Sequence, residues 1–233
     1  MKSGSLGRYR LFRTSLRVVL IGLIGTAFWI WMKNRVERLP FYTKTQEGVL
    51  EGLGHFGQVP DFSLIERSGR NLGLADLQGK VWIANFIYTH CSDSCPLQSA
   101  RMAELQKDLS EEKEPVLSLS KDVRLVSISV DPERDTPEVL SEYAKRYGAD
   151  PSRWFFLTGE KEAIYHLAQG GFHLSAVEVP SEEQDASGAT YIHSSRFVLV
   201  DRQGQIRGYY HSTDSEALRR LLRDVRTLLQ EKT

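Results

Sequence analysis

The sequence of 233 residues predicts an α/β protein in which helices cover both faces of one sheet. Two patterns carry this prediction. Buried strands alternate with helices and then give way to a hairpin and a closing helix, which is typical of a layered α/β domain. The only two cysteines, Cys91 and Cys95, follow the most apolar predicted strand and come directly before a helix. About 190 residues remain after an apolar N-terminal segment, enough for one well-buried core.

Apolar runs rich in β-forming residues predict the strands. The run VWIANFIYT at 81–89 shows no polar alternation, which is typical of a central strand covered on both faces. A turn at 67–70 follows the first strand, and residues 202–204 connect the hairpin. The predicted strands are 62–65, 81–89, 124–130 and 154–157, with hairpin strands at 195–201 and 205–210.

Residues that favour helix ends mark the predicted helices. Pro96 suits a first helical position, where its missing N–H costs nothing. Leu97, Ala100, Leu105 and Leu109 then fall on one face of that helix. Further helices are predicted from Thr136-Pro137 to about Tyr147 with Gly148 as the stop, from about Glu160 to Gln169, and from the capping box Thr213-x-x-Glu216 onward.

The N-terminal segment predicts a membrane anchor. Val18 to Met32 is an uninterrupted apolar run, and Leu16 with a snorkelling Arg17 extends it by a turn. No small-residue cleavage site follows, which favours an uncleaved signal anchor over a cleavable signal peptide. The predicted organisation is a cytoplasmic tail at 1–15, a transmembrane anchor at 16–32, a tether at 33–57 and a folded domain at 58–233.

Charge is distributed unevenly along the chain. Residues 1–40 hold eight Lys or Arg and one acid, whereas residues 41–233 hold 22 basic and 29 acidic residues, a net charge of −7. The basic excess before the apolar run favours a cytoplasmic N-terminus. An acidic domain repels phosphate backbones, so nucleic acid is excluded as a partner.

The stretch THCSDSCPLQ at 89–98 places the cysteine pair on a loop between a buried strand and a helix N-terminus. This is the arrangement of the thioredoxin-like fold. Because Cys95 precedes a proline, we expect an extended backbone there, off the helix body. The helix N-terminus offers unsatisfied N–H groups, so at least one of the two cysteines should have a lowered pKa.

Four roles are open to the pair: buried structural cysteines, a stabilising disulfide, a redox couple and a metal site. The polar neighbours Ser92, Asp93 and Ser94 argue against a core position. Closing so short a loop removes little entropy from the unfolded chain, which argues against a purely stabilising disulfide. Redox chemistry and metal binding remain, and neither excludes the other. Asp93 is expected to shape the loop or cap the helix rather than to bind a metal.

A metal site needs a third ligand from elsewhere, and six histidines are available. His193 is the candidate because it immediately precedes the buried strand SRFVLV. In a thioredoxin-like sheet, the approach to that strand passes beside the cysteine loop. Two soft thiolates and one imidazole suit copper, and Cu(I) in particular, whereas a structural zinc site usually has a fourth protein ligand.

Four stretches resemble the Sco/SenC family of membrane-anchored copper proteins of cytochrome c oxidase assembly. They are YTHCSDSCPLQ (88–98), SVDPERDTPEVLSEYAKRYG (129–148), FFLTG (155–159) and HSSRFVLVDRQGQIRGYY (193–210). The resemblance implies a thioredoxin-like fold, with Cys91, Cys95 and His193 as ligands of a copper ion, Cu(I) or Cu(II). Two positions depart from the usual family pattern: Ser92 stands where proline is common, and Ile192 where an acidic residue is often found.

The same resemblance implies a partner and a compartment. The partner is the CuA site of cytochrome c oxidase subunit II, and other copper chaperones or thiol reductases are further candidates. The domain would face the periplasm from a bacterial inner membrane, or the intermembrane space from the mitochondrial inner membrane. The lack of a long Arg/Ser-rich amphipathic leader favours the bacterial inner membrane.

Two functions are expected, and both use the Cys91–Cys95 pair. A metallochaperone, which is not an enzyme, would hold copper on the reduced pair and His193, and oxidation to a disulfide would prevent loading. A thiol–disulfide reductase is the alternative, although three residues separate the cysteines where thioredoxins have two, and a reductase has no need of His193. A peroxiredoxin-like peroxidase is the weakest candidate because the motif around its cysteine is missing.

Two further stretches carry open expectations. DPERDTP at 131–137 is expected to pair Arg134 with an acid and to start a helix at Thr136-Pro137, or alternatively to form a docking surface near the metal. Residues 172–192 are extra length, expected to form a second hairpin or a flap beside the site.

Overall fold

The computed structural model describes Thr26 and residues 53–91, 94–110, 121–174 and 194–231. Two compact units are distinguished, Met1–Gly48 and Val49–Thr233, and the elements below belong to the second. Thr26 apart, the predicted tail and anchor lie outside the described residues, as does the predicted tether up to residue 52. None of the helices in the described ranges is long and apolar enough to cross a bilayer.

The domain is built on one seven-stranded sheet with the order β2-β1-β5-β4-β3-β6-β7. The strands are β1 (Ser63–Glu66), β2 (Asn71–Gly73), β3 (Val81–Ile87), β4 (Val123–Ser129), β5 (Trp154–Thr158), β6 (Arg196–Val200) and β7 (Ile206–His211). β3, β4 and β5 are parallel, and the other pairings are antiparallel. The parallel β3–β4 pair, continued by antiparallel β6 and β7, confirms the predicted thioredoxin-like α/β fold. β2 has only three residues, too few to show alternation, and was not predicted.

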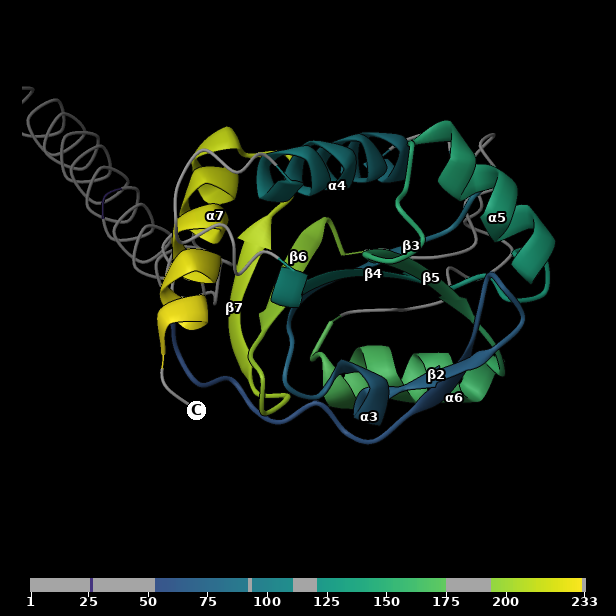
Figure 1. Ribbon diagram of the computed structural model, residues 1–233, viewed down its shortest axis with the longest axis horizontal. Coiled ribbons are helices and arrows are strands. Elements are labelled where there is room, and N and C mark those ends of the chain that lie inside the picture. The colour runs from purple at the N-terminus through teal and green to yellow at the C-terminus, as the bar shows by residue number, and fades with distance from the viewer. Residues whose placement is uncertain (1–25, 27–52, 92–93, 111–120, 175–193, 232–233) are drawn as a thin grey trace, which may run out of the picture. The chain divides into compact units, whose positions relative to one another are not determined.

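Helices lie on both sides of the sheet (Figure 1). They are α3 (Leu74–Leu77), α4 (Ser94–Ser110), α5 (Pro137–Arg146), α6 (Lys161–His166) and α7 (Ser215–Gln230), and a π-helical turn, η2 (Leu167–Gly171), continues α6. α4 and α5 run along one face and α3 and α6 along the other, while α7 packs against β7 and β3. The two right-handed crossovers β3-α4-β4 and β4-α5-β5 account for α4 and α5 sharing a face.

β3 is the centre of the core, as its nearly continuous apolar sequence predicts, and all seven of its residues are buried. The rings of Trp82 and Phe86 make edge-to-face contacts with Phe172, at centroid distances of 5.9 and 5.5 Å. Because side chains alternate along a strand, Asn85 points to the opposite side, toward α4. Since Asn85 is fully buried, its amide needs hydrogen-bond partners on that side.

The start and the buried face of α4 differ from the prediction. The helix begins at Ser94 rather than Pro96, so Cys95 belongs to its first turn. Leu97, expected on the buried face, is 43% exposed. Leu105 and Leu109 are buried as predicted, and the rest of the buried face follows the helical spacing that starts at Cys95, with Gln98, Ser99 and Met102. The polar residues Gln98 and Ser99 interrupt the apolar periodicity of this face, so the sequence pattern does not show it in full.

The ends of α5 are confirmed, whereas the cap of α7 is not the predicted one. Thr136 caps α5, and Gly148 follows its end with a φ of 62°, a left-handed conformation that glycine adopts easily. α7 is capped by Asp214, whose carboxylate accepts a hydrogen bond from the Glu216 N–H at 2.8 Å, and not by Thr213. Aspartate is as good a cap as threonine, so the pattern alone misplaces the start by one residue.

Residues 54–59 lie along the outer edge of β7. The backbone N–H groups of Gly54, Phe56 and Val59 donate to carbonyls of the β6–β7 hairpin at 2.8, 2.9 and 2.9 Å. The ring of Phe56 also packs edge-on against Tyr209, with a centroid distance of 5.5 Å. The end of the segment predicted as a tether is therefore part of the folded domain. Its glycines interrupt any alternation, so the sequence did not reveal this pairing.

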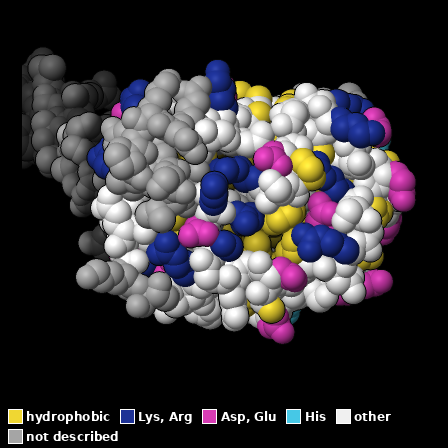
Figure 2. All heavy atoms as spheres, viewed as in Figure 1, with side chains coloured by type: hydrophobic (Ala, Val, Ile, Leu, Met, Phe, Trp, Pro, Cys, Tyr) yellow, Lys and Arg dark blue, Asp and Glu magenta, His cyan; other side chains and the backbone are white. Residues whose placement is uncertain are grey.

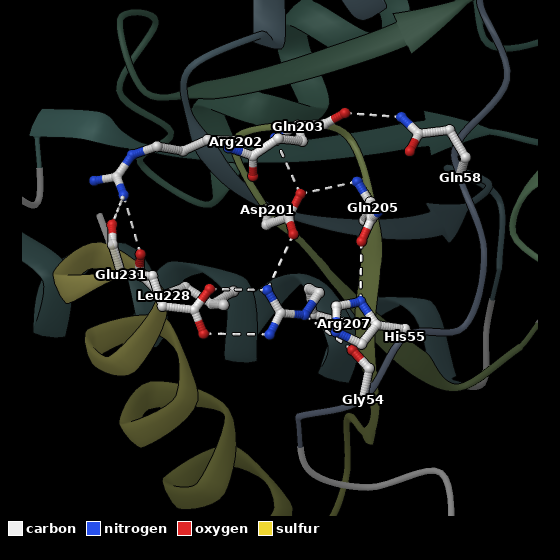
Figure 3. A network of polar contacts seen from close by, with 10 residues as sticks. All are labelled: Gly54, His55, Gln58, Asp201, Arg202, Gln203, Gln205, Arg207, Leu228 and Glu231. Atoms are coloured by element: carbon white, nitrogen blue, oxygen red, sulfur yellow. Dashed lines mark hydrogen bonds and ion pairs between the residues drawn. The ribbon is translucent and has the colours of Figure 1, made fainter. Parts of the chain in front are cut away.

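A buried ion-pair cluster joins this segment to the last helix (Figure 3). The Arg207 guanidinium, on β7, contacts Asp201 at 3.1 Å and Glu231 at 3.0 Å. Its Nε–H donates to the Gly54 carbonyl at 2.9 Å. Arg202 donates to backbone carbonyls at the end of α7, where the negative end of the helix dipole favours a cation. The cluster therefore connects residues 54–59, the β6–β7 hairpin and the end of α7.

Basic and acidic side chains are interspersed over the face of the molecule shown in Figure 2. The structure records surface ion pairs such as Lys80–Asp122 and Lys145–Glu142, each at 2.6 Å. Exposed pairs of this kind contribute only about 0–1 kcal/mol each to stability. The stability of the domain therefore depends mainly on its core and on the Arg207 cluster.

Candidate metal centre

Three segments meet at the edge of the sheet where the cysteine pair lies. β3 and β4 are parallel and end at the same edge, and antiparallel β6 begins there. The cysteine loop follows β3, residues 130–136 follow β4, and Ser194 precedes β6. Because the topology fixes this convergence, segments about a hundred residues apart in the chain face one another at one site.

Both cysteines are reduced, and both are turned into the core. Cys95 is fully buried and Cys91 is 7% exposed, so the expectation of an exposed loop position is wrong for both. The Cys91 N–H donates to the Tyr88 carbonyl at 3.3 Å, which turns the chain just after β3. The Cys95 N–H, in the first turn of α4, donates to Cys91 Sγ at 3.4 Å. The helix N-terminus thus offers an amide to the Cys91 sulfur, as the helix-terminus argument predicts.

Burial raises the pKa of the Cys95 thiol far above its ordinary value. A backbone hydrogen bond with Tyr88 opposes this rise, whereas the neighbouring Cys91 and the charge of Asp135 add to it. The expectation of a lowered pKa is therefore wrong for Cys95, because the loss of hydration outweighs the helix N-terminus. At neutral pH this sulfur carries its proton, and a metal ion that binds it must displace that proton.

Asp135 is a buried residue of the site that the sequence analysis missed. Its carboxylate accepts hydrogen bonds from the Thr89 N–H at 3.0 Å and the Thr89 hydroxyl at 2.5 Å. It also accepts one from the Ser129 hydroxyl at 2.6 Å. Asp135 therefore fastens the end of β3, just before the cysteine loop, to the end of β4. Asp135 belongs to the motif DPERDTP, in which the sequence predicts only that Arg134 pairs with an acid; Arg134 lies 3.9 Å from Asp131.

Replacing Asp135 with alanine is expected to destabilise the domain by about 2 kcal/mol, because buried donors on Thr89 and Ser129 would lose their acceptor. Asp135→Asn is the matched control. Its carbonyl can accept from the Thr89 N–H and its amide can donate to the Thr89 hydroxyl, so we expect a much smaller loss. Urea unfolding followed by circular dichroism measures both. Equal stabilities for the alanine variant and the parent protein would contradict the role assigned to the carboxylate.

The structure brings the two cysteines together, whereas His193 lies outside the described residues, as do Ser92, Asp93 and the segment 175–192. The residue after His193 is described. The Ser194 carbonyl accepts a hydrogen bond from the Gln98 side chain at 3.4 Å. Gln98 lies one helical turn after Cys95 on the buried face of α4. The chain therefore passes beside the cysteine helix one residue after the predicted ligand.

The described histidines are exposed or partly exposed, and three of them contact neighbouring polar side chains. His55 contacts the Gln205 side chain at 2.9 Å, His90 contacts Thr89 at 3.2 Å and His211 contacts Thr213 at 3.2 Å. Within the described ranges, no three His, Cys, Asp or Glu side chains converge in a way that could hold a metal ion. A third ligand for the cysteine pair must therefore come from a residue outside those ranges, or from water or a partner.

The donor set of the site determines which metals it suits. Two buried sulfur atoms favour soft ions, since thiolates are the ligands that Cu(I) prefers. The Asp135 carboxylate already accepts three hydrogen bonds, so it is committed to the protein. The site therefore offers sulfur rather than oxygen, and hard cations such as Mg²⁺ or Ca²⁺ do not fit it.

Known proteins resemble this chain over most of the folded domain. The SCO1/SenC family model matches residues 53–230. A curated relative from Bacillus subtilis (strain 168), named SCO1 protein homolog, is 33% identical over 171 residues, which are 73% of this chain and 82% of the relative. The match to the family model begins at residue 53, next to residues 54–59 that pair with β7, so it covers the folded domain from its first described residues.

Two solved structures extend the comparison. BsSco, described as having a disulfide switch and as a member of the Sco family of cytochrome c oxidase assembly proteins, superposes with a TM-score of 0.65 at 32% identity. The match covers 78% of this chain and 99% of that one. ScoI of Bradyrhizobium japonicum, solved with copper bound, superposes with a TM-score of 0.57 at 27% identity, covering 72% of this chain and 99% of that one.

Proposed function

Because this chain belongs to the SCO1/SenC family, we propose that it binds one copper ion through Cys91, Cys95 and His193 and delivers it during cytochrome c oxidase assembly. The observation that carries the proposal is the buried, reduced cysteine pair at the N-terminus of α4, with the Cys95 N–H directed at Cys91 Sγ. Copper bound in relatives such as ScoI of Bradyrhizobium japonicum supports it.

Each residue has a distinct role in this proposal. Cys91 supplies a sulfur that accepts an amide N–H from α4, which favours its anionic form as a ligand. Cys95 supplies a second sulfur that must lose its proton on binding, so copper loading releases protons. His193 supplies an imidazole nitrogen as the third ligand. Copper is the cargo, and it leaves by ligand exchange with the receiving protein.

The receiving protein and the location are part of the same proposal. The CuA site of cytochrome c oxidase subunit II is the recipient, and residues 16–32 anchor the chain in a bacterial inner membrane with the domain in the periplasm. The apolar run from Val18 to Met32 supports the anchor. The periplasm is an oxidising compartment, in which the reduced Cys91–Cys95 pair could form a disulfide. A cysteine pair that can change its redox state in this way fits delivery of copper outside the cytoplasm.

A thiol–disulfide reductase is the second candidate, and the disulfide switch described for BsSco favours it. The pair is suited to this chemistry in one order only. Cys91, the more exposed of the two at 7%, would attack a partner disulfide, and the fully buried Cys95 would lose its proton to resolve the mixed disulfide and release the partner as a dithiol.

The test is a titration of the reduced protein with Cu(I) against a competing chelator, followed by transfer to a soluble CuA fragment of subunit II. We expect one-to-one binding, copper transfer, and roughly a hundredfold weaker binding for His193→Ala, the order expected for one of three ligands. His166→Ala, an exposed histidine at the end of α6, is the matched control and should bind like the parent protein.

Two results would overturn parts of the proposal separately. Unchanged copper affinity in His193→Ala would remove His193 from the ligand set. Binding without transfer, together with rapid reduction of partner disulfides by the metal-free protein, would favour the reductase over the chaperone.

A further inference from the structure

An exposed histidine stands next to the cysteine pair, and hydrogen bonds connect it to the core. The Nδ1 atom of His90 lies 3.2 Å from the Thr89 hydroxyl oxygen, and that hydroxyl donates to the Asp135 carboxylate at 2.5 Å. Asp135 is fully buried, Thr89 is partly buried and His90 is exposed. These three side chains therefore form a line of hydrogen bonds that reaches the surface at the residue directly before Cys91.

The partners along this line determine which nitrogen of His90 carries the proton. The Asp135 carboxylate accepts from three donors, as an ionised carboxylate does, and it receives the only hydroxyl proton of Thr89. The Thr89 oxygen can then only accept from His90, so Nδ1 carries the proton of the neutral ring. Nε2 therefore keeps its lone pair. Metal-binding histidines are typically held in this way, with one ring nitrogen donating to the protein and the other free for the metal.

The burial of the two sulfurs gives such a nitrogen a use. Cys95 is fully buried and Cys91 is 7% exposed, so a copper carrier cannot reach both sulfurs at once. His90 is the residue before Cys91, and consecutive Cα atoms are only about 3.8 Å apart. Within the described ranges, His90 does not converge with both sulfurs as a closed three-ligand site. Its exposed nitrogen is therefore suited to a step before or after the resting site forms.

We propose that His90 is an entry and exit ligand, which binds arriving copper transiently through Nε2, passes it to Cys91, and receives it again when it leaves. This inference rests on the proposed function and adds a step to it. Each new copper–ligand bond replaces one that breaks, copper keeps its valence, and the protons of the thiols go to solvent. The step needs only His90 and the two cysteines, whichever group supplies the third ligand of the resting site.

The first test measures the rates of copper exchange. Reduced protein is mixed with a Cu(I)–chelator complex without oxygen to follow uptake, and copper-loaded protein is mixed with excess chelator to follow release. His90→Ala should slow both by about tenfold, which corresponds to a barrier higher by about 1.4 kcal/mol. The dissociation constant should stay unchanged, because it is the ratio of the two rates. His55→Ala, which removes an exposed histidine that contacts Gln205 at 2.9 Å, is the matched control and should exchange copper like the parent protein.

The second test changes the tautomer with a substitution that keeps the shape of the buried side chain. In Asp135→Asn, the carbonyl oxygen can still accept from the Thr89 N–H and the Ser129 hydroxyl, while the amide donates to the Thr89 hydroxyl oxygen. The Thr89 proton then turns to His90 Nδ1, and the ring proton moves to Nε2. Long-range proton–nitrogen NMR spectra of the metal-free proteins, in mildly alkaline buffer where imidazoles are neutral, should show Nδ1–H in the parent protein and Nε2–H in the variant.

A double-mutant cycle connects the tautomer to the rates. Asp135→Asn should slow copper exchange, because the proton on Nε2 occupies the position of the metal. In a His90→Ala background it should slow exchange no further, because its effect passes through the imidazole. The cycle therefore separates the tautomer from any other effect of the lost charge.

Each outcome decides a separate point. Copper exchange at the parent rate in His90→Ala would overturn the inference, as would Nε2–H in the parent spectra. A loss of affinity as large as the loss of rate would make His90 a ligand of the resting site and would overturn it too. Equal slowing by Asp135→Asn with and without His90 would overturn the role of the tautomer. If a variant lacking both cysteines binds Cu(I) like the parent protein, the proposed function itself fails, and that result is visible before any His90 variant is measured.

Discussion

Replacing Cys95 with serine should weaken Cu(I) binding by about a thousandfold, or about 4 kcal/mol, roughly a third of the ~10–16 kcal/mol with which thiolate-containing sites of zinc-finger peptides bind their metal. A hydroxyl is a poor ligand for a soft ion and holds its proton at neutral pH. Because Cys95 is fully buried and serine is similar in size, the domain should stay folded. Cys91→Ser should show a loss of the same order.

The matched control for this prediction is Met102→Leu. Met102 is a second buried sulfur-containing residue on α4, two helical turns after Cys95, and its replacement should leave copper affinity unchanged. Oxidising the parent protein to the Cys91–Cys95 disulfide should abolish tight binding as well, and reduction should restore it. Tight one-to-one binding by Cys95→Ser, or by the oxidised protein, would exclude the pair as the copper site.

Replacing Arg207 with methionine should lower the free energy of unfolding by about 3 kcal/mol, because it leaves the buried Asp201 carboxylate without its cation. Asp201 keeps hydrogen bonds from the Gln203 and Gln205 N–H groups, so we expect the lower end of the usual range. The pair with Glu231 adds little, because the Glu231 side chain is 47% exposed. Figure 3 shows how the guanidinium joins these groups to Gly54.

Urea unfolding of the copper-free protein measures this loss, and thermal unfolding should show a midpoint lower by roughly 6–12 °C for a domain of this size. Arg223→Met is the control, because Arg223 is an exposed arginine of α7. Its replacement should change stability by less than about 0.5 kcal/mol. A cost for Arg207→Met no greater than that of the control would show that the cluster contributes nothing measurable.

The sequence predicted those parts of the fold that depend on local pattern. β3 was recognised because a nearly continuous apolar run, interrupted only by Asn85, is typical of a strand buried on both faces. α5 was recognised because its cap and its stop lie within twelve residues of each other. β2 and the pairing of residues 54–59 were missed because they depend on partners distant in the chain, and their own residues carry no period.

The same division applies to the candidate site. Cys91 and Cys95 stood out because they are the only cysteines and they follow a buried strand. Asp135 and Gln98 did not, because each acts through partners that only the folded sheet brings near: Thr89 lies 46 residues from Asp135, and Ser194 lies 96 residues from Gln98. The helical spacing of Cys95, Gln98 and Met102 can be read from the sequence, and it marks the buried face of α4.

The pairing of residues 54–59 with β7 has a consequence for handling the protein. β7 is the last strand of the sheet, and an uncovered strand of this kind is a template on which a second molecule can add a strand. In the full chain residues 54–59 occupy that place along the start of β7, at Ile206 and Arg207. A shortened version that starts at Val59 would expose it, and should self-associate in light scattering where a version that starts at Leu53 stays monodisperse.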